Sequence, residues 1–516
     1  MKRSFLLMLL AVLFSTLLSA QPISKSDLKA LDKYYEQVAG DWNIPGFTVA
    51  IVKDGEIVFS KGYGVKEVGQ DKQPDGNTLY AIASNSKAFT SALVAMLVQE
   101  GKLGWNDKVT DYLPYFKLYD AWVSKEMTIR DLLCHRSGLG TFSGDFIWYK
   151  SDLSSEEIIR RAAYLPKAFD FRAGYGYSNL MFITAGEIIR TITGKPWSDF
   201  VQERILDPLD MGRTVTTPFD LDKKGNYATP HALVDGRNVP IDWVDWQEIG
   251  ALGGIISSVN DVSKWMIFNM NNGIIGNDTL LTASSRNMLW TPHNNFTVNH
   301  VNANDFETNF SGYALGWSIS DYHGHLRINH GGGYDGMITS VNMLPDLKLG
   351  VVVLSNGLES PTNAITYYTL DKILGIDGKD YSAEYLERIR KRPALDPRIS
   401  RAIEARVEGT EPSLALEKYQ GVYYSDIYGE ITVKLENDKL RLYFEHSADL
   451  SATLKHWHYD VWEIDWDKIH AWFDFGTLRF ILDNNLGISG MDFSVPNNDI
   501  FFEELKPGRI KDIDKN

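Results

Sequence analysis

Strand patterns lie at both ends of a long helical stretch, and this order constrains the fold more than any other feature. Residues 47–59 hold two β-rich runs joined by Asp54-Gly55, a dipeptide typical of a tight hairpin. Strand patterns return over residues 326–354, whereas residues 106–273 are mostly helical segments broken by Gly, Pro and Asp loops. We therefore expect an α/β (α+β) fold, in which an antiparallel sheet built from distant segments is flanked by helices and carries an inserted helical lobe.

A helix is predicted directly after the first strands, from about Ser84 to Glu100, and Gly101 ends it. Its large apolar residues recur at helical spacing: Phe89, Leu93, Met96 and Leu97. This spacing predicts an amphipathic helix with one buried side.

The C-terminal part of the chain has a different pattern. Residues 413–516 form short runs of period two with turns every ~8–12 residues, which predicts a small all-β barrel or sandwich. Charged residues dominate 376–412, which we interpret as a charged linker. The main domain is then expected to span residues 21–375.

The first twenty residues have the three parts of a secretory signal peptide. Lys2 and Arg3 precede an apolar run over residues 5–18, and small residues end at Ala20 before Gln21. The alternative is a membrane anchor, but the run is shorter than the ~20 residues that a spanning helix needs. We expect a signal peptide over 1–20, a periplasmic or secreted protein, and no membrane insertion after cleavage.

Charge and cysteine content narrow the functional classes. The 516 residues carry a formal net charge of −15, whereas nucleic-acid-binding proteins normally present a basic face. We therefore expect no nucleic-acid partner. Cys134 is the one cysteine, so the chain has no internal disulfide. Its apolar neighbours favour a small buried side chain over a cysteine nucleophile.

Ser84-Asn85-Ser86-Lys87 places a hydroxyl and an amine three residues apart, on one face of a predicted helix. The partial positive charge at a helix N-terminus favours an alkoxide at Ser84 and disfavours a protonated Lys87. A lysine that loses its proton readily is a usable base for a serine nucleophile. A second Ser-x-x-Lys begins at Ser26, but it lies just past the predicted cleavage site. Ser84 and Lys87 are therefore the candidate catalytic pair.

Tyr177-Ser178-Asn179 precedes a helical run over residues 180–192. Acyl transfer needs a proton shuttle, and a phenol near a cationic lysine can have its pKa lowered enough to serve. Asn179 can hold Lys87 or a substrate amide through its two-sided hydrogen bonding. The alternative for Tyr177 is a packed aromatic residue beside Tyr175.

Asn329-His330 and the three glycines at 331–333 follow a predicted strand. Glycines let a backbone approach a ligand closely and expose the N–H groups that an oxyanion needs. We expect the backbone N–H groups of Ser84 and Gly333 to bind the oxyanion, with His330 and Gly332 beside the substrate. The alternative is a glycine-rich turn with a surface histidine.

The order of Ser-x-x-Lys, Tyr-x-Asn and His-x-Gly resembles the serine β-lactamase and penicillin-binding protein family. Residues 128–139, 206–212 and 253–261 also match that family, and the resemblance covers about residues 27–375. It is most similar to the branch of class C β-lactamases, D-aminopeptidases and D,D-peptidases. Ala173 and Asp210 depart from the family's usual Pro and Gly at two loop positions.

The resemblance implies two-step acyl transfer to Ser84 from a small-molecule or peptide substrate, with Lys87 and Tyr177 moving the proton and no metal or organic cofactor. His330 stands where true β-lactamases carry Lys, which favours the cleavage of amides or esters, D-amino-acid substrates included. Which of Lys87 and Tyr177 is the first base stays open, as does the oligomeric state.

Three alternatives follow from the same residues. The chain is a true β-lactamase, a receptor that β-lactams acylate without turnover, or an interaction protein on an inactive hydrolase fold. The deacylation rate separates the first two. The joint presence of Ser84, Lys87, Tyr177 and Asn179 argues against the third.

From about residue 416 the chain resembles the lipocalin-like barrel that follows many of these hydrolases. His456 and His458 lie two apart on a predicted strand, and with His470 they suggest a metal site, but we expect none. The tryptophans are expected to fill the barrel: Trp457, Trp462, Trp466 and Trp472. Since no proposed proton-transfer group lies there, a chain ending near residue 380 is predicted to fold and to be acylated at Ser84.

Overall fold

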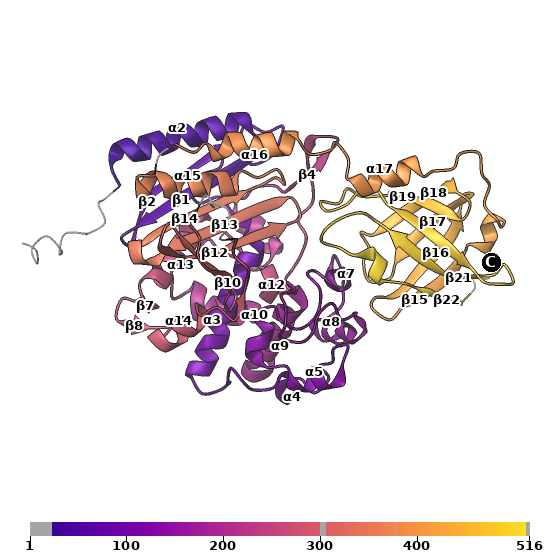
Figure 1. Cartoon of the computed structure of the whole chain (residues 1–516), viewed down its shortest axis with the longest axis horizontal. Coiled ribbons are helices and arrows are strands. Elements are labelled where there is room, and N and C mark those ends of the chain that lie inside the picture. The colour runs from indigo at the N-terminus through magenta and orange to yellow at the C-terminus, as the bar shows by residue number, and fades with distance from the viewer. Residues whose placement is uncertain (1–22, 300–305, 377, 512–516) are drawn as a thin grey trace, which may run out of the picture.

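A larger body of helices and sheet and a smaller barrel lie beside each other along the longest axis of the molecule (Figure 1). The computed structural model describes residues 23–299, 306–376 and 378–511. The signal peptide predicted over 1–20 and its cleavage site before Gln21 therefore lie outside the described residues. Across the part that is described, no helix has the length and apolarity needed to cross a membrane.

The larger body is built on an eight-stranded antiparallel sheet whose strands come from both ends of the domain. Val49 pairs with Val353, some three hundred residues later, which confirms the predicted sheet of distant segments. In sheet order the strands are β2 (Glu56–Gly64), β1 (Gly46–Lys53), β14 (Leu349–Ser355), β13 (Met337–Leu344), β12 (His325–Tyr334), β11 (Ser318–Tyr322), β10 (Ser311–Tyr313) and β9 (Asn294–Asn295).

Helices cover both faces of this sheet, so its central strands β1 and β14 are buried along their whole length. On one face lie α2 (Lys25–Asp41), α15 (Thr362–Leu374) and α16 (Tyr381–Arg390), and on the other α13 (Val259–Met270) packs against β1 and β14 (Figure 1). The apolar β1 sequence therefore faces protein on both sides.

The inserted lobe surrounds α3 (Ser86–Gln99), which is buried from Ser86 to Leu97. The expectation of one buried side was wrong, because α9 (Asn179–Thr193), α12 (Gly250–Gly253) and α14 (Ala283–Leu289) all pack against this helix. The lobe helices are α4 (Val109–Tyr112), α5 (Ala121–Glu126), α6 (Ile129–Leu132), α7 (Asp145–Trp148), α8 (Ser155–Arg161), α9 (Asn179–Thr193), α10 (Trp197–Val201), α11 (Leu221–Lys224), α12 (Gly250–Gly253) and α14 (Ala283–Leu289).

The C-terminal strands close into an eight-stranded barrel, which confirms the predicted barrel and rules out a sandwich. Alternate residues such as Ile431, Val433, Leu440 and Leu442 are buried inside it. The strands are β15 (Gly421–Ser425), β16 (Gly429–Glu436), β17 (Lys439–Phe444), β18 (Ser451–His458), β19 (Val461–Trp466), β20 (Thr477–Leu482), β21 (Ile488–Ser494) and β22 (Gly508–Lys511).

The segment predicted as a charged linker contains two helices, α16 and α17 (Pro397–Glu404). The first of them packs on the larger body: Trp42 donates its indole N–H to Ser382 Oγ at 2.8 Å, and Tyr381 donates to Asp371 at 2.7 Å. Only the part of the segment after α16 crosses to the barrel.

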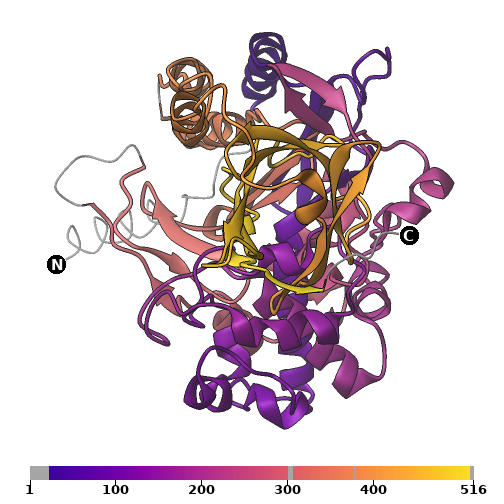
Figure 2. The same cartoon turned by 90° about the vertical axis from the view of Figure 1, so that its right-hand side faces the viewer.

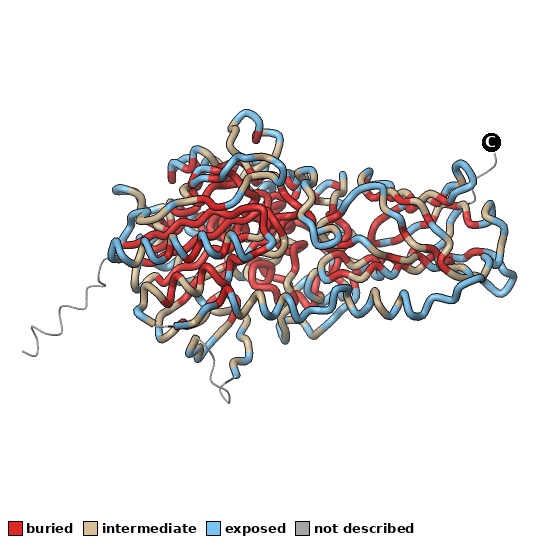
Figure 3. Tube along the Cα trace, turned by 90° about the horizontal axis from the view of Figure 1, so that it is seen from above, coloured by how far each residue is buried: buried red, intermediate tan, exposed pale blue. Residues whose placement is uncertain are grey.

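The barrel docks on the lobe at α7. The Phe146 ring lies 4.7 to 5.5 Å from the rings of Tyr428, Phe444 and Phe502, so one apolar core continues from the lobe into the barrel. Figure 3 shows buried chain in both bodies and where they meet, and Figure 2 shows the barrel end on, in front of the larger body. The barrel is thus placed against the elements that build the site.

Candidate active site

Ser84 lies on a single 3₁₀ turn (Ala83–Asn85) that leads directly into α3. Ala83 has φ of +48°, a left-handed conformation that a residue with a side chain adopts only when its surroundings hold it there. Thr339 of β13 provides that hold, because it donates to Ile82 O at 3.1 Å and accepts from Asn85 Nδ2 at 2.9 Å. The turn that carries the Ser84 hydroxyl is therefore pinned to the sheet.

Lys87 has no exposed surface and points its amine at three oxygens. Its Nζ lies 2.9 Å from Ser84 Oγ, 2.7 Å from Asn179 Oδ1 and 2.7 Å from Leu252 O. Burial lowers the pKa of Lys87 to about 7, against an opposing effect of the Asp145 carboxyl. A neutral amine is thus available next to the Ser84 hydroxyl near neutral pH.

Tyr177 comes together with the pair as predicted: its hydroxyl is hydrogen-bonded with Ser84, and the Lys87 Nζ lies 4.9 Å from the centre of its ring. The predicted lowering of its pKa was wrong. Burial raises the pKa of Tyr177 well above 10, and the hydrogen bond to Ser84 opposes this only in part. A phenol that keeps its proton can donate a hydrogen bond and relay a proton, but it cannot accept the first one. Lys87 is therefore the group able to accept the proton of Ser84.

Asn179 holds Lys87 through its Oδ1, and its Nδ2 donates to Asp145 Oδ2 at 2.6 Å. Asp145 was missed in the sequence, since it belongs to none of the motifs and reaches Asn179 only through the fold. Burial raises the pKa of Asp145 well above its usual value, while Trp148 and Asn179 hydrogen-bond to the carboxyl. Asp145 therefore fixes the orientation of the Asn179 amide, so that its Oδ1 faces Lys87.

His330 is buried, so the alternative of a surface histidine was wrong. Its Nδ1 lies 2.6 Å from Gly331 O, so Nδ1 carries the proton, and its Nε2 accepts from the Tyr313 hydroxyl at 2.9 Å. Burial, helped by the Lys87 charge, lowers the pKa of His330 to about 3. This side chain is a neutral wall of the site.

Gly332 is required by the close approach of β12 to the catalytic turn, because a Cβ there would lie 2.2 Å from Ile82 O. Gly333 lines the cavity beside Ser84. His135 is a further residue that the sequence interpretation missed: its ring lies 4.2 Å from that of Tyr177, and its Nδ1 accepts from Ser178 N at 3.1 Å. It fixes the ring and backbone of the Tyr177 loop.

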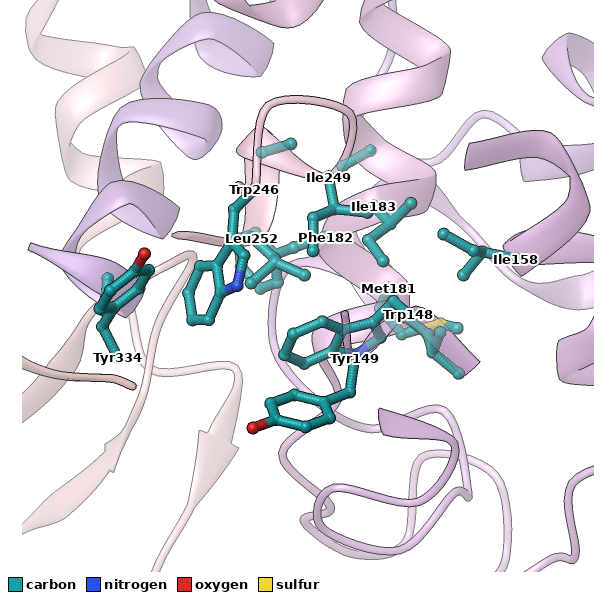
Figure 4. Packing of buried hydrophobic residues seen from close by; sticks show 14 of the residues in the cluster. Trp148, Tyr149, Ile158, Met181, Phe182, Ile183, Trp246, Ile249, Leu252 and Tyr334 are labelled. Carbon is teal, nitrogen blue, oxygen red and sulfur yellow. The ribbon is translucent and has the colours of Figure 1, made fainter. Parts of the chain in front are cut away.

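These groups open into a cavity of about 250 Å³. On the lobe side, Trp148 and Trp246 line it and pack edge to face at 5.5 Å, as Figure 4 shows next to Leu252. On the other side it is lined by Trp472, Asp499 and Ile500 from the barrel. Trp462 is buried in the barrel core as expected, and Trp466 is partly buried against that core. Trp457 is buried instead beside α17, with the Arg406 guanidinium 4.3 Å from the centre of its ring. The placement of Trp472 in the interior was wrong, because Trp472 lines the cavity at Ser84.

The histidines considered as metal ligands and the cysteine Cys134 have no part in this cavity. His456 Nε2 lies 2.9 Å from Tyr459 O, and His470 Nδ1 faces Lys150 Nζ at 3.2 Å. Within the described ranges, no three His, Cys, Asp or Glu side chains are grouped so that they could hold a metal. Cys134 is buried, and burial raises the pKa of its thiol to about 12, which confirms a buried side chain in place of a nucleophile.

Comparison with known proteins agrees with this geometry. The family model described as Beta-lactamase matches residues 31–374, and a domain of unknown function (DUF3471) matches residues 405–507. Unguisins hydrolase ungD' of Aspergillus campestris is 30% identical over 429 residues, 79% of this chain and 78% of that protein. Protein flp of Staphylococcus aureus is 26% identical, covering 65% of this chain and 64% of its own length.

A solved structure, the octameric penicillin-binding protein homologue from Pyrococcus abyssi, has the same fold. The TM-score is 0.61 at 22% identity, over 91% of this chain and 98% of that one. With the family model matched over most of the chain, with Ser84 and Tyr177 lining one cavity and with Lys87 hydrogen-bonded to Ser84, this chain belongs to the β-lactamase family of serine hydrolases.

Proposed function

We propose that this chain is an exported enzyme that cleaves amide or ester bonds of small or D-amino-acid-containing substrates through an acyl-enzyme on Ser84. The observation that carries the proposal is the buried Lys87 amine, 2.9 Å from Ser84 Oγ and with a pKa of about 7. A base poised near neutral pH beside a serine hydroxyl is the arrangement that nucleophilic catalysis needs.

In the first step Lys87 takes the proton of Ser84 as Oγ bonds to the substrate carbonyl carbon. The carbonyl oxygen gains the negative charge, and the N–H groups of Ser84 and Gly333 bind it. Tyr177 then relays a proton to the leaving group as its bond to the carbonyl carbon breaks. Water attacks the acyl-enzyme by the same route in reverse, which releases the acid and returns the proton to Ser84.

His330 supports amides or esters over β-lactams as substrates. The pKa of its imidazole is lowered to about 3 by burial, so it offers no cation to an anionic substrate where true β-lactamases carry Lys. The relative named unguisins hydrolase supports hydrolysis as the outcome, against a receptor that is acylated without turnover.

The experiment is labelling of Ser84 followed by a substrate panel. A fluorophosphonate and a fluorescent penicillin are added separately, and the adduct is mapped by peptide mass spectrometry. D-amino-acid amides, short esters and a chromogenic cephalosporin are then compared for turnover. We expect an adduct on Ser84 and faster turnover of amides or esters. An adduct on Ser26 or Ser137 contradicts the assignment, and a stable acyl-enzyme with every substrate favours the receptor.

Export is tested separately, because the site chemistry does not depend on it. N-terminal sequencing of the protein from its native host is expected to start at Gln21, in the periplasm or medium. A chain that keeps Met1 in the membrane fraction contradicts cleavage and favours the anchor.

A further inference from the structure

A second and larger hollow lies beside the catalytic cavity, between the barrel and the β4 strand (His231–Val234) of the larger body. We call it the barrel groove. Its volume is about 540 Å³, roughly twice that of the catalytic cavity at about 250 Å³. None of the proposed catalytic residues Ser84, Lys87 and Tyr177 lines this groove.

The barrel groove and the catalytic cavity share a wall. Trp472, on the loop between β19 and β20, lines both of them. The loop after β21 also serves both, because Pro496 lines the groove while Asp499 and Ile500 line the cavity. The two hollows are therefore neighbours on either side of Trp472.

Trp472, the shared wall, is held against β12, the strand that carries Gly333. Asp335 lies in the turn that follows β12, is fully buried, and accepts from the Tyr149 hydroxyl at 2.7 Å. Burial raises the pKa of Asp335, and interactions with Lys150, Tyr149 and Trp472 oppose the rise. The ring of Trp472 reaches Gly333 so closely that a Cβ there would lie 3.3 Å from its Cη2. The indole is thus held between the barrel and β12.

The lining of the groove indicates what it binds. Aromatic rings of Trp466, Trp472 and Phe475 line it together with two exposed aliphatic side chains. Ile469 is 44% exposed and Leu233 is 36% exposed, so both gain from being covered by an apolar ligand group. Three of the four charged side chains in the lining are acidic: Glu463, Asp465 and Asp474, with Lys468 the fourth. This balance disfavours an anionic ligand.

We propose that the barrel groove is a second substrate subsite, which takes an aromatic or aliphatic group carried beyond the scissile bond, and that Trp472 is the specificity-determining residue between the two sites. This inference rests on the proposed acylation of Ser84. It makes the barrel a part of substrate recognition, with neutral or cationic apolar groups preferred over anionic ones.

The test compares three ethoxy fluorophosphonates that differ in one chain: methyl, 4-phenylbutyl and 4-carboxybutyl. The rate of Ser84 labelling is measured for each by mass spectrometry, so turnover plays no part. We expect the phenylbutyl probe to react at least ~10-fold faster than the methyl probe, and the carboxybutyl probe to show no such gain.

Two variants locate the effect. Ile469→Glu places a charge in the groove, and Trp472→Ala removes the wall; both should bring the phenylbutyl-to-methyl ratio near 1. Ile481→Glu is the matched control, since Ile481 is 36% exposed on β20 outside the groove lining, and it should keep the wild-type ratio. Ile469→Glu changes an exposed side chain, so its result stands even if Trp472→Ala fails to fold.

The outcomes separate the two proposals. An unchanged ratio in Ile469→Glu with Ser84 still labelled overturns the groove and leaves the proposed function intact. A carboxybutyl probe as fast as the phenylbutyl probe overturns the charge preference. If none of the probes labels Ser84 in the wild type, the proposed function fails, and the groove proposal falls with it.

Discussion

The larger body and the barrel both line the cavity at Ser84 with aromatic side chains, but the hydrogen-bonded polar groups around the nucleophile come from the body. The body contributes polar side chains from α3, α9 and β12, each held by hydrogen bonds within the body: Lys87, Asn179 and His330. The barrel contributes Trp472, Asp499 and Ile500 from two loops between strands. The comparison suggests that the body performs the chemistry and the barrel shapes the space.

Burial explains the difference between the two regions. A buried amine or amide costs free energy unless every polar atom finds a partner, and partners stay in place best on rigid elements. Lys87 meets that requirement with Ser84, Asn179 and Leu252. An aliphatic wall such as Ile500 has no such requirement, so a loop can supply it.

Ser84→Ala should lower kcat on a short ester by ~10⁴-fold or more, because the nucleophile of a covalent mechanism is removed. Ser26→Ala is the control, since it changes the serine of the second Ser-x-x-Lys, which is exposed on α2. Steady-state hydrolysis and circular dichroism together check the result. Full activity in Ser84→Ala would show that Ser84 is not the nucleophile and that the reaction takes place elsewhere.

Lys87→Met should lower the acylation rate by ~10²–10⁴-fold, with Lys29→Met as the control. In the wild type the rate should rise with pH through about 7, because Lys87 is protonated below that value and neutral above it.

The lowered pKa of Lys87 also makes the free energy of unfolding depend on pH. The direction of this dependence follows from the number of protons bound in the folded and unfolded states. The unfolded chain holds the Lys87 proton up to the ordinary lysine pKa of 10.5, whereas the folded chain loses it near 7. The unfolded state thus binds more protons between these values, so this group makes the free energy of unfolding rise with pH there. Lys87→Met should remove that rise in urea titrations at pH 7 and 9. A slope equal to that of the wild type would contradict the lowered pKa.

Removing the barrel should lower the reactivity of the active site less than Ser84→Ala does. The cut belongs after Arg392 and not near residue 380, because α16 packs on the larger body through Tyr381 and Ser382. The shortened chain should lose thermal stability, since Phe146 and Tyr149 become exposed. Labelling of Ser84 by a methyl fluorophosphonate should fall by no more than ~100-fold. A folded chain that is not labelled would place part of the chemistry in the barrel.

Glu504→Ala should loosen the contact between the two regions. The Glu504 carboxylate accepts from Ser143 Oγ at 2.5 Å and from Gly144 N at 2.8 Å, just before Asp145. We expect a loss of about 1–3 kcal/mol in the free energy of unfolding and a several-fold lower acylation rate. Glu504→Gln keeps an acceptor oxygen and should recover part of both. Glu503→Ala, at an exposed neighbouring residue, should change neither.

The smallest effect is expected at Cys134. Because its thiol is buried with a pKa raised to about 12, a maleimide should react with it only after unfolding. Cys134→Ala should keep activity within about twofold and cost about 1 kcal/mol of stability. Rapid maleimide labelling of the native protein, measured by intact mass, would show that the lobe around α6 opens far more easily than the body's core.

Much of this molecule follows from local sequence patterns. The hairpin at Asp54-Gly55, the late strands over 326–354 and the period of two after residue 413 each need only neighbouring residues to be recognised, and each is present. The same holds for Ser84 and Lys87, because three residues along a helix place their side chains on one face whatever surrounds it.

Tertiary structure decided what depends on residues far apart in the chain. Asp145 meets Asn179, and Trp472 reaches Gly333, through contacts that no periodicity records. Burial, too, is a property of the whole fold: it lowers the pKa of Lys87 and raises that of Tyr177, although a nearby cation alone would lower the latter. The sequence determined which groups could act. Packing determined their protonation and the shape of the space around Ser84, because desolvation depends on every atom that excludes water.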